Sequence, residues 1–329
     1  MKQILFFCIT CIICHFAQGQ NLKISSPILS PKKDKIVFSI YSGSNVDIYT
    51  YHFVEDTIVR ATNSTELNSD YQYKSFFNWL DNDRILFISK HGNGIAQQWI
   101  LDLSKNTLEP NGYSLSNEYF LRYSPLNEES YYISSLNGKE PAVYRRKLYS
   151  SKFQKVTKKN INHIGTNLSP KFTYLTFKEM PLGTLLVYSL IENKYIKTTL
   201  PPKNVSILSW SPKEDKFIYS QGYFLDNNSA PKHSIFEYDI ELQKSNILFK
   251  DLDFVYDVIW NPCETKYLYS SLNELYVKDI ISSETQKFDV IGEPICWFEN
   301  CFSILFKTDK QLFIFNIDTR EIKMIIDLN

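Results

Sequence analysis

Three histidines in polar, loop-like surroundings are the residues of this chain best suited to metal binding or acid–base chemistry. His91 lies in "KHGNG", His163 in "NINHIG" and His233 in "APKHS". Imidazole binds metals readily and titrates near neutral pH. The three residues are far apart in the sequence, and their spacing implies no specific coordination geometry. They can therefore act together only if the fold brings them to one rim.

The longest irregular segment is a second candidate site. It reads "QGYFLDNNSAPKHS" and carries Tyr223, Phe224, Asp226 and His233. Exposed aromatic rings beside polar groups on a long loop suit contact with a carbohydrate or a protein. We take these four residues, with His163 and His91, as candidate binding residues. The alternative is an ordinary surface loop with solvated histidines.

Motifs that would define a catalytic centre are absent. The string nearest to the G-x-S-x-G nucleophile elbow is "GYSLS" at Gly112, which lacks the second glycine. Asp81 and Asp83 lie in "DNDR", where Asp and Asn serve turn geometry. No pair of carboxylates is singled out for glycoside cleavage. We therefore assign no catalytic residue, no metal ligand and no cofactor, and we favour a protein that is not an enzyme.

A repeat runs through the chain and must position these side chains. Each copy has an apolar strand, a Ser-Pro or similar turn with charged residues, and a second apolar strand. Successive copies are about 36 to 50 residues apart, which is the spacing of propeller blades. The copies are "ILSPKKDKIVFSI", "FNWLDNDRILFIS", "LRYSPLNEESYYIS", "TNLSPKFTYLTFK", "LSWSPKEDKFIYS", "VIWNPCETKYLYS" and "ICWFENCFSILFK".

Two further strands follow each hairpin, as in "SIFEYDI" and "SNILF". Four short strands per unit, in radially stacked units, make a β-propeller. The sequence therefore predicts an all-β protein with a single propeller of seven blades, with a six-bladed ring as the alternative. Trp79, Trp210, Trp260 and Trp297 occupy one repeat position, which indicates packing between blades. "NLKISS" could add an outer strand to the last blade.

The repeat resembles the WD40-like repeat of TolB-type propellers and of the propeller domains of prolyl-oligopeptidase-like enzymes. The resemblance rests on the aromatic or apolar residue, the Ser-Pro pair, the charged turn and the strand that follows, as in "WSPKEDKFIYS". It covers almost the whole chain after residue 20. The Asp-Gly turn that is usual in the family is missing from these copies. Some seven-bladed polysaccharide lyases are similar in placing metal-binding histidines around the central channel.

The N-terminus has the pattern of a secretory signal peptide. Lys2 precedes an apolar run, and Ala17 and Gly19 precede a possible cleavage point before Gln20. This predicts a signal peptide at 1–19, a propeller domain at 20–329, and a secreted or periplasmic protein. No later run has the length of a membrane span.

Three cysteines follow the predicted cleavage point, namely Cys263, Cys296 and Cys301. An odd number leaves at least one thiol without a partner in the same chain. Cys296 and Cys301 could form a disulfide across a hairpin if their Cβ atoms face each other. The alternative is that all three are free thiols.

Lys+Arg and Asp+Glu both number 36, so net charge favours neither nucleic acid nor an anionic membrane. Together these observations predict an exported, monomeric, non-catalytic binding or scaffold protein. It would present loops to a protein or glycan partner in the cell envelope. The alternative is a metal-dependent polysaccharide lyase or glycoside-active enzyme with its site in the central channel.

Overall fold

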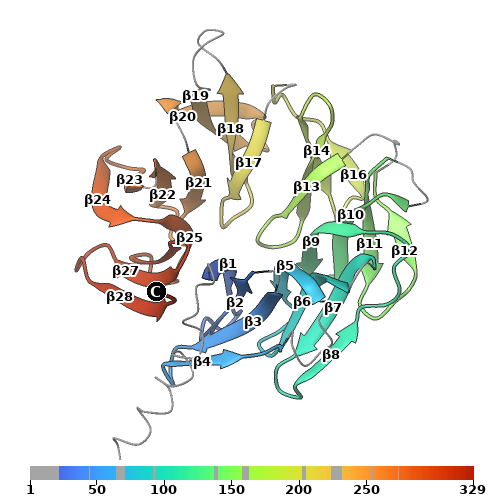
Figure 1. Ribbon diagram of the computed structural model, residues 1–329. Coiled ribbons are helices and arrows are strands. Elements are labelled where there is room, and N and C mark those ends of the chain that lie inside the picture. Colours follow the sequence, from blue (N-terminus) through green and yellow to red (C-terminus); the bar gives the residue numbers. More distant parts are fainter. Residues whose placement is uncertain are drawn as a thin grey trace, which may run out of the picture.

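The chain forms a ring of seven four-stranded antiparallel sheets, each built from consecutive strands (Figure 1). The computed structural model describes residues 22–43, 45–63, 71–91, 94–136, 140–157, 163–201, 205–223, 232–252, 255–272 and 274–329. The predicted signal peptide at 1–19 lies outside these ranges and stays a prediction. The seven-bladed all-β propeller is confirmed.

Blades 1 to 4 are made of β1 (Leu22–Leu29), β2 (Lys35–Ser42), β3 (Asn45–His52), β4 (Thr57–Arg60); β5 (Tyr71–Trp79), β6 (Arg84–His91), β7 (Ala96–Asp102), β8 (Thr107–Pro110); β9 (Glu118–Ser124), β10 (Glu129–Ser134), β11 (Ala142–Lys147), β12 (Phe153–Lys155); β13 (His163–Leu168), β14 (Tyr174–Glu179), β15 (Thr184–Ser189) and β16 (Lys194–Ile196).

Blades 5 to 7 are made of β17 (Val205–Trp210), β18 (Lys216–Tyr223), β19 (Lys232–Asp239), β20 (Lys244–Leu252); β21 (Val255–Trp260), β22 (Lys266–Ser271), β23 (Glu274–Asp279), β24 (Thr285–Ile291); β25 (Glu293–Trp297), β26 (Ser303–Lys307), β27 (Gln311–Asn316) and β28 (Ile322–Asp327).

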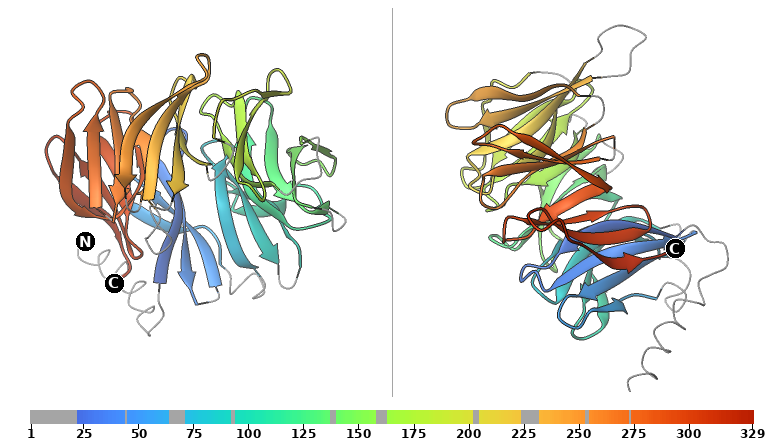
Figure 2. Two further views of the ribbon diagram at one scale, coloured as in Figure 1. Left: turned by 90° about the horizontal axis from the view of Figure 1, so that it is seen from above. Right: turned by 90° about the vertical axis from the view of Figure 1, so that its left-hand side faces the viewer.

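Both faces of each sheet are covered by neighbouring blades, which explains the long apolar runs in the second strands. On β2, Ile36, Val37 and Phe38 are all fully buried. Ile36 and Phe38 pack towards blade 7, whereas Val37 packs towards blade 2 with Phe77. Successive side chains of a strand point to opposite faces, so one strand contributes to two seams. We use "seam" for the interface between two neighbouring blades, which stand side by side in Figure 2.

The ring closes without a shared strand. β1 pairs with β2 as the first strand of blade 1, and blade 7 is complete with β25 to β28. The prediction that "NLKISS" adds an outer strand to the last blade is therefore wrong. Side chains join blades 7 and 1 instead: Ile24 packs with Leu305, and the Ile24 amide donates to the Asp309 carbonyl at 2.7 Å.

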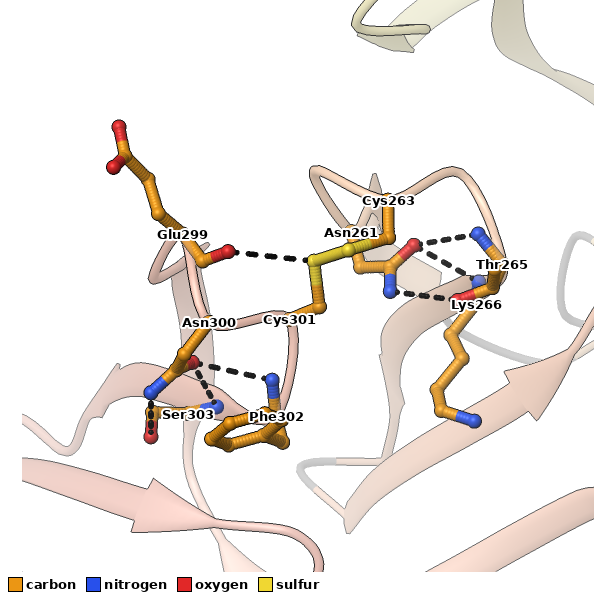
Figure 3. The surroundings of a disulfide bond; sticks show 9 residues. All are labelled: Asn261, Cys263, Thr265, Lys266, Glu299, Asn300, Cys301, Phe302 and Ser303. Carbon is orange, nitrogen blue, oxygen red and sulfur yellow. Dashed lines mark hydrogen bonds between the residues drawn. A yellow bond between two sulfur atoms is a disulfide. The ribbon is translucent and has the colours of Figure 1, made fainter.

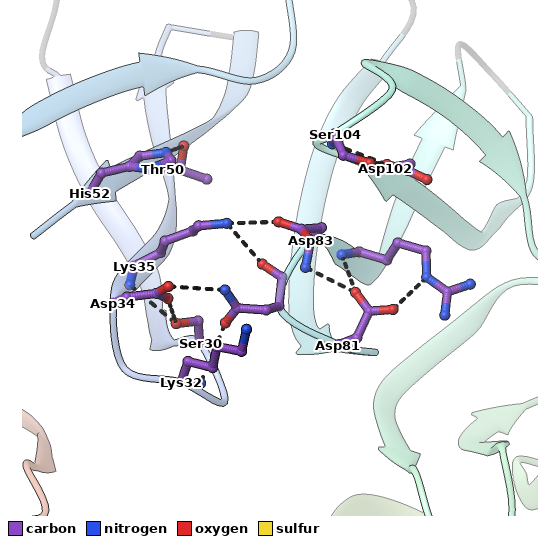
Figure 4. A network of polar contacts seen from close by, with 12 residues as sticks. Ser30, Lys32, Asp34, Lys35, Thr50, His52, Asp81, Asp83, Asp102 and Ser104 are labelled. Carbon is purple, nitrogen blue, oxygen red and sulfur yellow. Dashed lines mark hydrogen bonds and ion pairs between the residues drawn. The ribbon is translucent and has the colours of Figure 1, made fainter. Parts of the chain in front are cut away.

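Contacts between the first turns of neighbouring blades link many of the seams at one end. Between blades 1 and 2, Asn82 donates to Asp34 and Lys35 pairs with Asp83 at 2.8 Å (Figure 4). The side chain of Glu214 accepts from the Lys171 amide across the seam between blades 4 and 5. These contacts hold each blade to the next by groups that are already ordered by their own turns.

A disulfide makes the corresponding link between blades 6 and 7. It joins Cys263 to Cys301, not Cys296 to Cys301 (Figure 3). The hairpin pairing predicted from the sequence is wrong because Cys296 lies on β25, whereas Cys301 lies in the following turn and reaches the turn of the preceding blade. Cys296 is a free thiol. Burial raises its pKa to about 12, so it stays protonated and poorly reactive.

Replacing Cys301 with Ala is expected to lower the free energy of unfolding by about 3 to 4 kcal/mol, because the disulfide closes a loop of 38 residues. Denaturant unfolding under non-reducing conditions measures this. Cys263→Ala should give the same loss, and the double variant should add little to either single one. Mass spectrometry of a non-reduced digest that linked Cys296 to Cys301 would contradict the assignment.

Candidate functional site

A β-bulge in each blade places side chains of the innermost strands towards the ring axis. The register between first and second strands shifts at corresponding points in all seven sheets. A bulge leaves an extra residue without a partner and changes the direction of its side chain. Leu208, Asp257 and Ile295 lie at these shifts in blades 5, 6 and 7.

These three residues line one cavity, which we call the axial cavity. It has a volume of about 320 Å³ and is bounded by the innermost strands of blades 4 to 7. Its polar wall consists of Asn167, Ser209 and Asp257. The lining combines these polar groups with apolar side chains, as small-ligand sites do, and the volume is at the lower end of the usual range.

Asp257 is the most perturbed group of the axial cavity. Burial, and secondarily the negative charge of Glu293, raise its pKa to about 7. No cation pairs with this carboxyl within the described part of the chain. Asp257 is therefore neutral in about half of the molecules near pH 7, and it can donate or accept a hydrogen bond. A carboxyl with this property in a cavity is a candidate functional group.

The four tryptophans that end the first strands of their blades differ in the hydrogen bonding of their indole N–H groups. The Trp79 indole N–H donates to the Ile28 carbonyl across one seam, and that of Trp297 donates to Ile259 across another, both at 3.2 Å. In blades 5 and 6, the indole nitrogens of Trp210 and Trp260 have no partner among the described residues, although both are buried. The seams that flank blade 5 therefore lack a hydrogen bond that other seams make.

The same region contains a third buried polar atom that has no hydrogen-bond partner among the described residues. The Ser209 hydroxyl is buried and has no partner in the described ranges. Ser209 and Trp210 both border the axial cavity. A buried polar group without a partner costs free energy, roughly 1 to 3 kcal/mol. Ser209 and Trp210 thus bring two such groups to the border of one cavity, where a ligand could supply their partners. The prediction that the four tryptophans lie between blades is confirmed.

Of the six residues predicted to bind, His163 lies in the protein interior. It is the first residue of β13, is 1% exposed, and its ring meets that of Phe177 edge-on at 5.3 Å. Its amide donates to the Pro141 carbonyl of blade 3. His163 therefore does not lie in a rim loop, because the first strand of blade 4 already begins at His163, ahead of the repeat copy that starts at Thr166.

The other five predicted residues are placed only in part. His233, on β19, borders a second cavity at the seam between blades 4 and 5. His91 and Tyr223 end β6 and β18, but their side chains are outside the described part. Phe224 and Asp226 lie outside the described residues altogether. Their roles in binding stay predictions.

The described residues do not form a metal centre. No group of three or more His, Cys, Asp or Glu side chains in these ranges is placed to hold a metal ion. Nor does this part of the chain form a helix with the length and apolarity needed to cross a membrane. The geometry brings together Asn167, Ser209 and Asp257 instead. Asp257 was not among the residues predicted from the sequence, because its position depends on the bulge that all seven first strands share.

Comparison with known proteins identifies the fold of this chain but does not assign it to a family. No family model matches the chain, and no curated protein matches it. Among solved structures, an oligogalacturonate lyase in complex with manganese has a TM-score of 0.67 at 11% identity, covering 88% of this chain and 87% of that one. An oligogalacturonate lyase from Vibrio parahaemolyticus has a TM-score of 0.67 at 10% identity, covering 88% of each chain.

Propeller-containing peptidases are also similar. A puromycin-hydrolyzing peptidase from Mycobacterium tuberculosis has a TM-score of 0.69 at 8% identity, covering 94% of this chain and 53% of that one. A prolyl endopeptidase structure covers 96% of this chain and 51% of that one, at 12% identity. At these identities the likeness shows the propeller fold, in agreement with the resemblance to TolB-type repeats.

Stability should depend on the ionisation of Asp257. Its folded pKa of about 7 is above the ordinary value of 3.8, so the unfolded chain loses this proton first as pH rises. Stability from this group is therefore present below about pH 4 and is lost as pH rises to about 7, by up to about 4 kcal/mol. Asp257→Asn should remove this loss. The measurement is denaturant unfolding of both proteins at several pH values.

Asp289→Asn is the matched control, since Asp289 is exposed on β24 of the same blade. It should keep the pH dependence of the parent protein. If Asp257→Asn and the parent protein lost stability equally between pH 4 and 7, the raised pKa of Asp257 would be refuted.

Proposed function

We propose that this protein is a binding propeller that holds a hydroxylated ligand, such as a sugar unit of a glycan, in the axial cavity. The observation that carries the proposal is Asp257, a partly buried carboxyl without a cation among the described residues, on the wall of a cavity of about 320 Å³. Near pH 7 such a group can either donate to or accept from a ligand hydroxyl.

The rest of the wall supports the same ligand class. The Asn167 amide supplies two donors and an acceptor, and the Ser209 hydroxyl supplies one donor. Ile259 and Ile295 provide apolar surface for the C–H faces of a ring. A ligand of alternating hydroxyl and C–H groups meets both kinds of wall, whereas a purely apolar ligand would leave the polar groups without partners.

Export to the cell envelope or beyond is part of the proposal. The signal-peptide pattern at 1–19 supports it, and so does the Cys263–Cys301 disulfide. Disulfides persist in oxidising compartments and are rare in the cytosol. A glycan or a glycan-bearing partner would be met in such a compartment.

The test is a glycan array followed by calorimetric titration of the best ligand. We expect saturable binding to the parent protein and at least a roughly tenfold loss for Asp257→Ala and for Ser209→Ala, since each removes a buried hydrogen bond to the ligand. Asp289→Asn should bind like the parent. Retention of no glycan, or equal binding by Asp257→Ala, would count against the proposal.

A second candidate is an enzyme that cleaves polysaccharides, which one observation favours. A carboxyl with a pKa of about 7 is suited to general acid–base catalysis at neutral pH. Two of the similar structures are oligogalacturonate lyases. The described residues do not fit a metal site, so the candidate rests on Asp257 and not on a metal.

Incubation with a panel of acidic and neutral polysaccharides, with and without manganese, separates the two candidates. Release of shortened products by the parent protein, and its loss in Asp257→Asn, would establish the enzyme. Binding of a polysaccharide without formation of shortened products in any of these incubations would favour the binding propeller over the enzyme.

A further inference from the structure

A second cavity lies at the other end of the seam between blades 4 and 5. It has a volume of about 340 Å³ and includes residues from the starts of β13 and β17, whereas the axial cavity includes residues from their ends. We call it the seam cavity. Its polar lining is formed by Lys178, Ser206, Ser220 and His233.

Lys178 is the charged group of the seam cavity, and it lacks a counter-charge among the described residues. Its ammonium lies 2.5 Å from the Ser206 hydroxyl oxygen, across the seam. No carboxylate pairs with it within the described ranges, and burial lowers its pKa. A partly desolvated cation without a counter-charge costs free energy, and an anion beside it would offset that cost.

Two other partly buried lysines on strands have a carboxylate partner. Lys216 pairs with Glu237 at 3.1 Å, and Lys266 pairs with Asp279 at 3.0 Å, each on the neighbouring strand of its own blade. The residue beside Lys178 on the next strand is Leu185. The position that would carry the acidic partner of Lys178 is therefore apolar.

One printed contact joins the two blades at the cavity wall. Ile164 lies opposite Lys178 on the first two strands of blade 4, and the Lys178 ammonium reaches the Ser206 hydroxyl of blade 5. Directly opposed residues on antiparallel strands project from the same face, so Ile164 borders the cavity beside Lys178. The Lys178 ammonium and the Ser206 hydroxyl are therefore available to one ligand.

The remaining walls leave room for the body of a ligand. His233 lies opposite Gly222 on the next strand. A side chain at Gly222 would place its Cβ 3.4 Å from the His233 ring, so glycine keeps the space beside the ring open. The connection between β14 and β15 adds Met180, Pro181 and Leu182 as an apolar side.

We propose that the seam cavity binds a small ligand with an oxyanion head, a carboxylate or a phosphate, using Lys178 as the cation and the Ser206 hydroxyl as a hydrogen-bond donor. A lysine acts as a point charge and does not by its geometry select between the two heads. This site is separate from the axial cavity and does not depend on the function proposed for it.

The test is calorimetric titration of the full chain, in a buffer free of phosphate and carboxylate, with D-glucuronate, inorganic phosphate and D-glucose. We expect one of the two anions to bind saturably and glucose, which matches glucuronate except for the charge, not to bind at this site. Which anion binds identifies the head. Lys178→Gln should weaken binding at least roughly tenfold, since it removes a charge-assisted contact.

Lys197→Gln is the matched control, because Lys197 is exposed and follows β16 of the same blade. It should bind the anion like the parent protein. If Lys178→Gln does not fold, Ser206→Ala takes its place and should also weaken binding. Absence of saturable binding by both anions, or binding that these variants leave unchanged, would overturn the proposal.

Discussion

Everything in this molecule depends on the packing of each blade against two neighbours. A single four-stranded sheet of this size cannot bury its apolar faces, but a ring of seven covers both faces of every sheet. The chain does not lock the ring by sharing a strand, so the seam between blades 7 and 1 has the same kind of contacts as the others. This seam is held by apolar packing of Ile24 with Leu305 and by the ion pair between Lys23 and Asp309. Separation at any one seam would open the ring, so the least stable seam limits the stability of the whole ring.

The fold could be predicted because all seven blades pack against their neighbours in the same way, and this packing repeats one sequence pattern along the chain. The tryptophan at the end of the first strand recurs in blades 2, 5, 6 and 7, where it packs against the preceding blade. The Cys263–Cys301 disulfide was not predicted because Cys296 and Cys301 are close together in one hairpin, whereas the two bonded cysteines lie in different blades. Cys263 and Cys301 occupy the turn positions held by Lys171 and Glu214 in blades 4 and 5, where the side chain of the later blade reaches the earlier one. An alignment of the turns contained that signal.

The site could not be predicted in the same way, because it arises where the repeat is imperfectly realised. Trp79 and Trp297 donate across their seams, whereas the equivalent Trp210 and Trp260 do not, and nothing in the repeat pattern distinguishes these four residues. Asp257 lies in a segment that reads as a connection, and only the bulge in β21 brings it to the axial cavity. Loop length drew attention to residues 221–234, of which His233 borders a cavity.

The seam cavity lies between blades 4 and 5, and the axial cavity extends from the inner strands of these two blades to those of blades 6 and 7. The buried groups without partners that make the region suitable for binding also make it less stable in the unliganded protein. A ligand that supplies those partners would stabilise the folded state in proportion to its affinity. Natural proteins keep such locally unfavourable arrangements where function requires them. The turn contact from Glu214 to Lys171 holds the two blades together at one end, so the seam can leave polar groups unsatisfied along its length without separating.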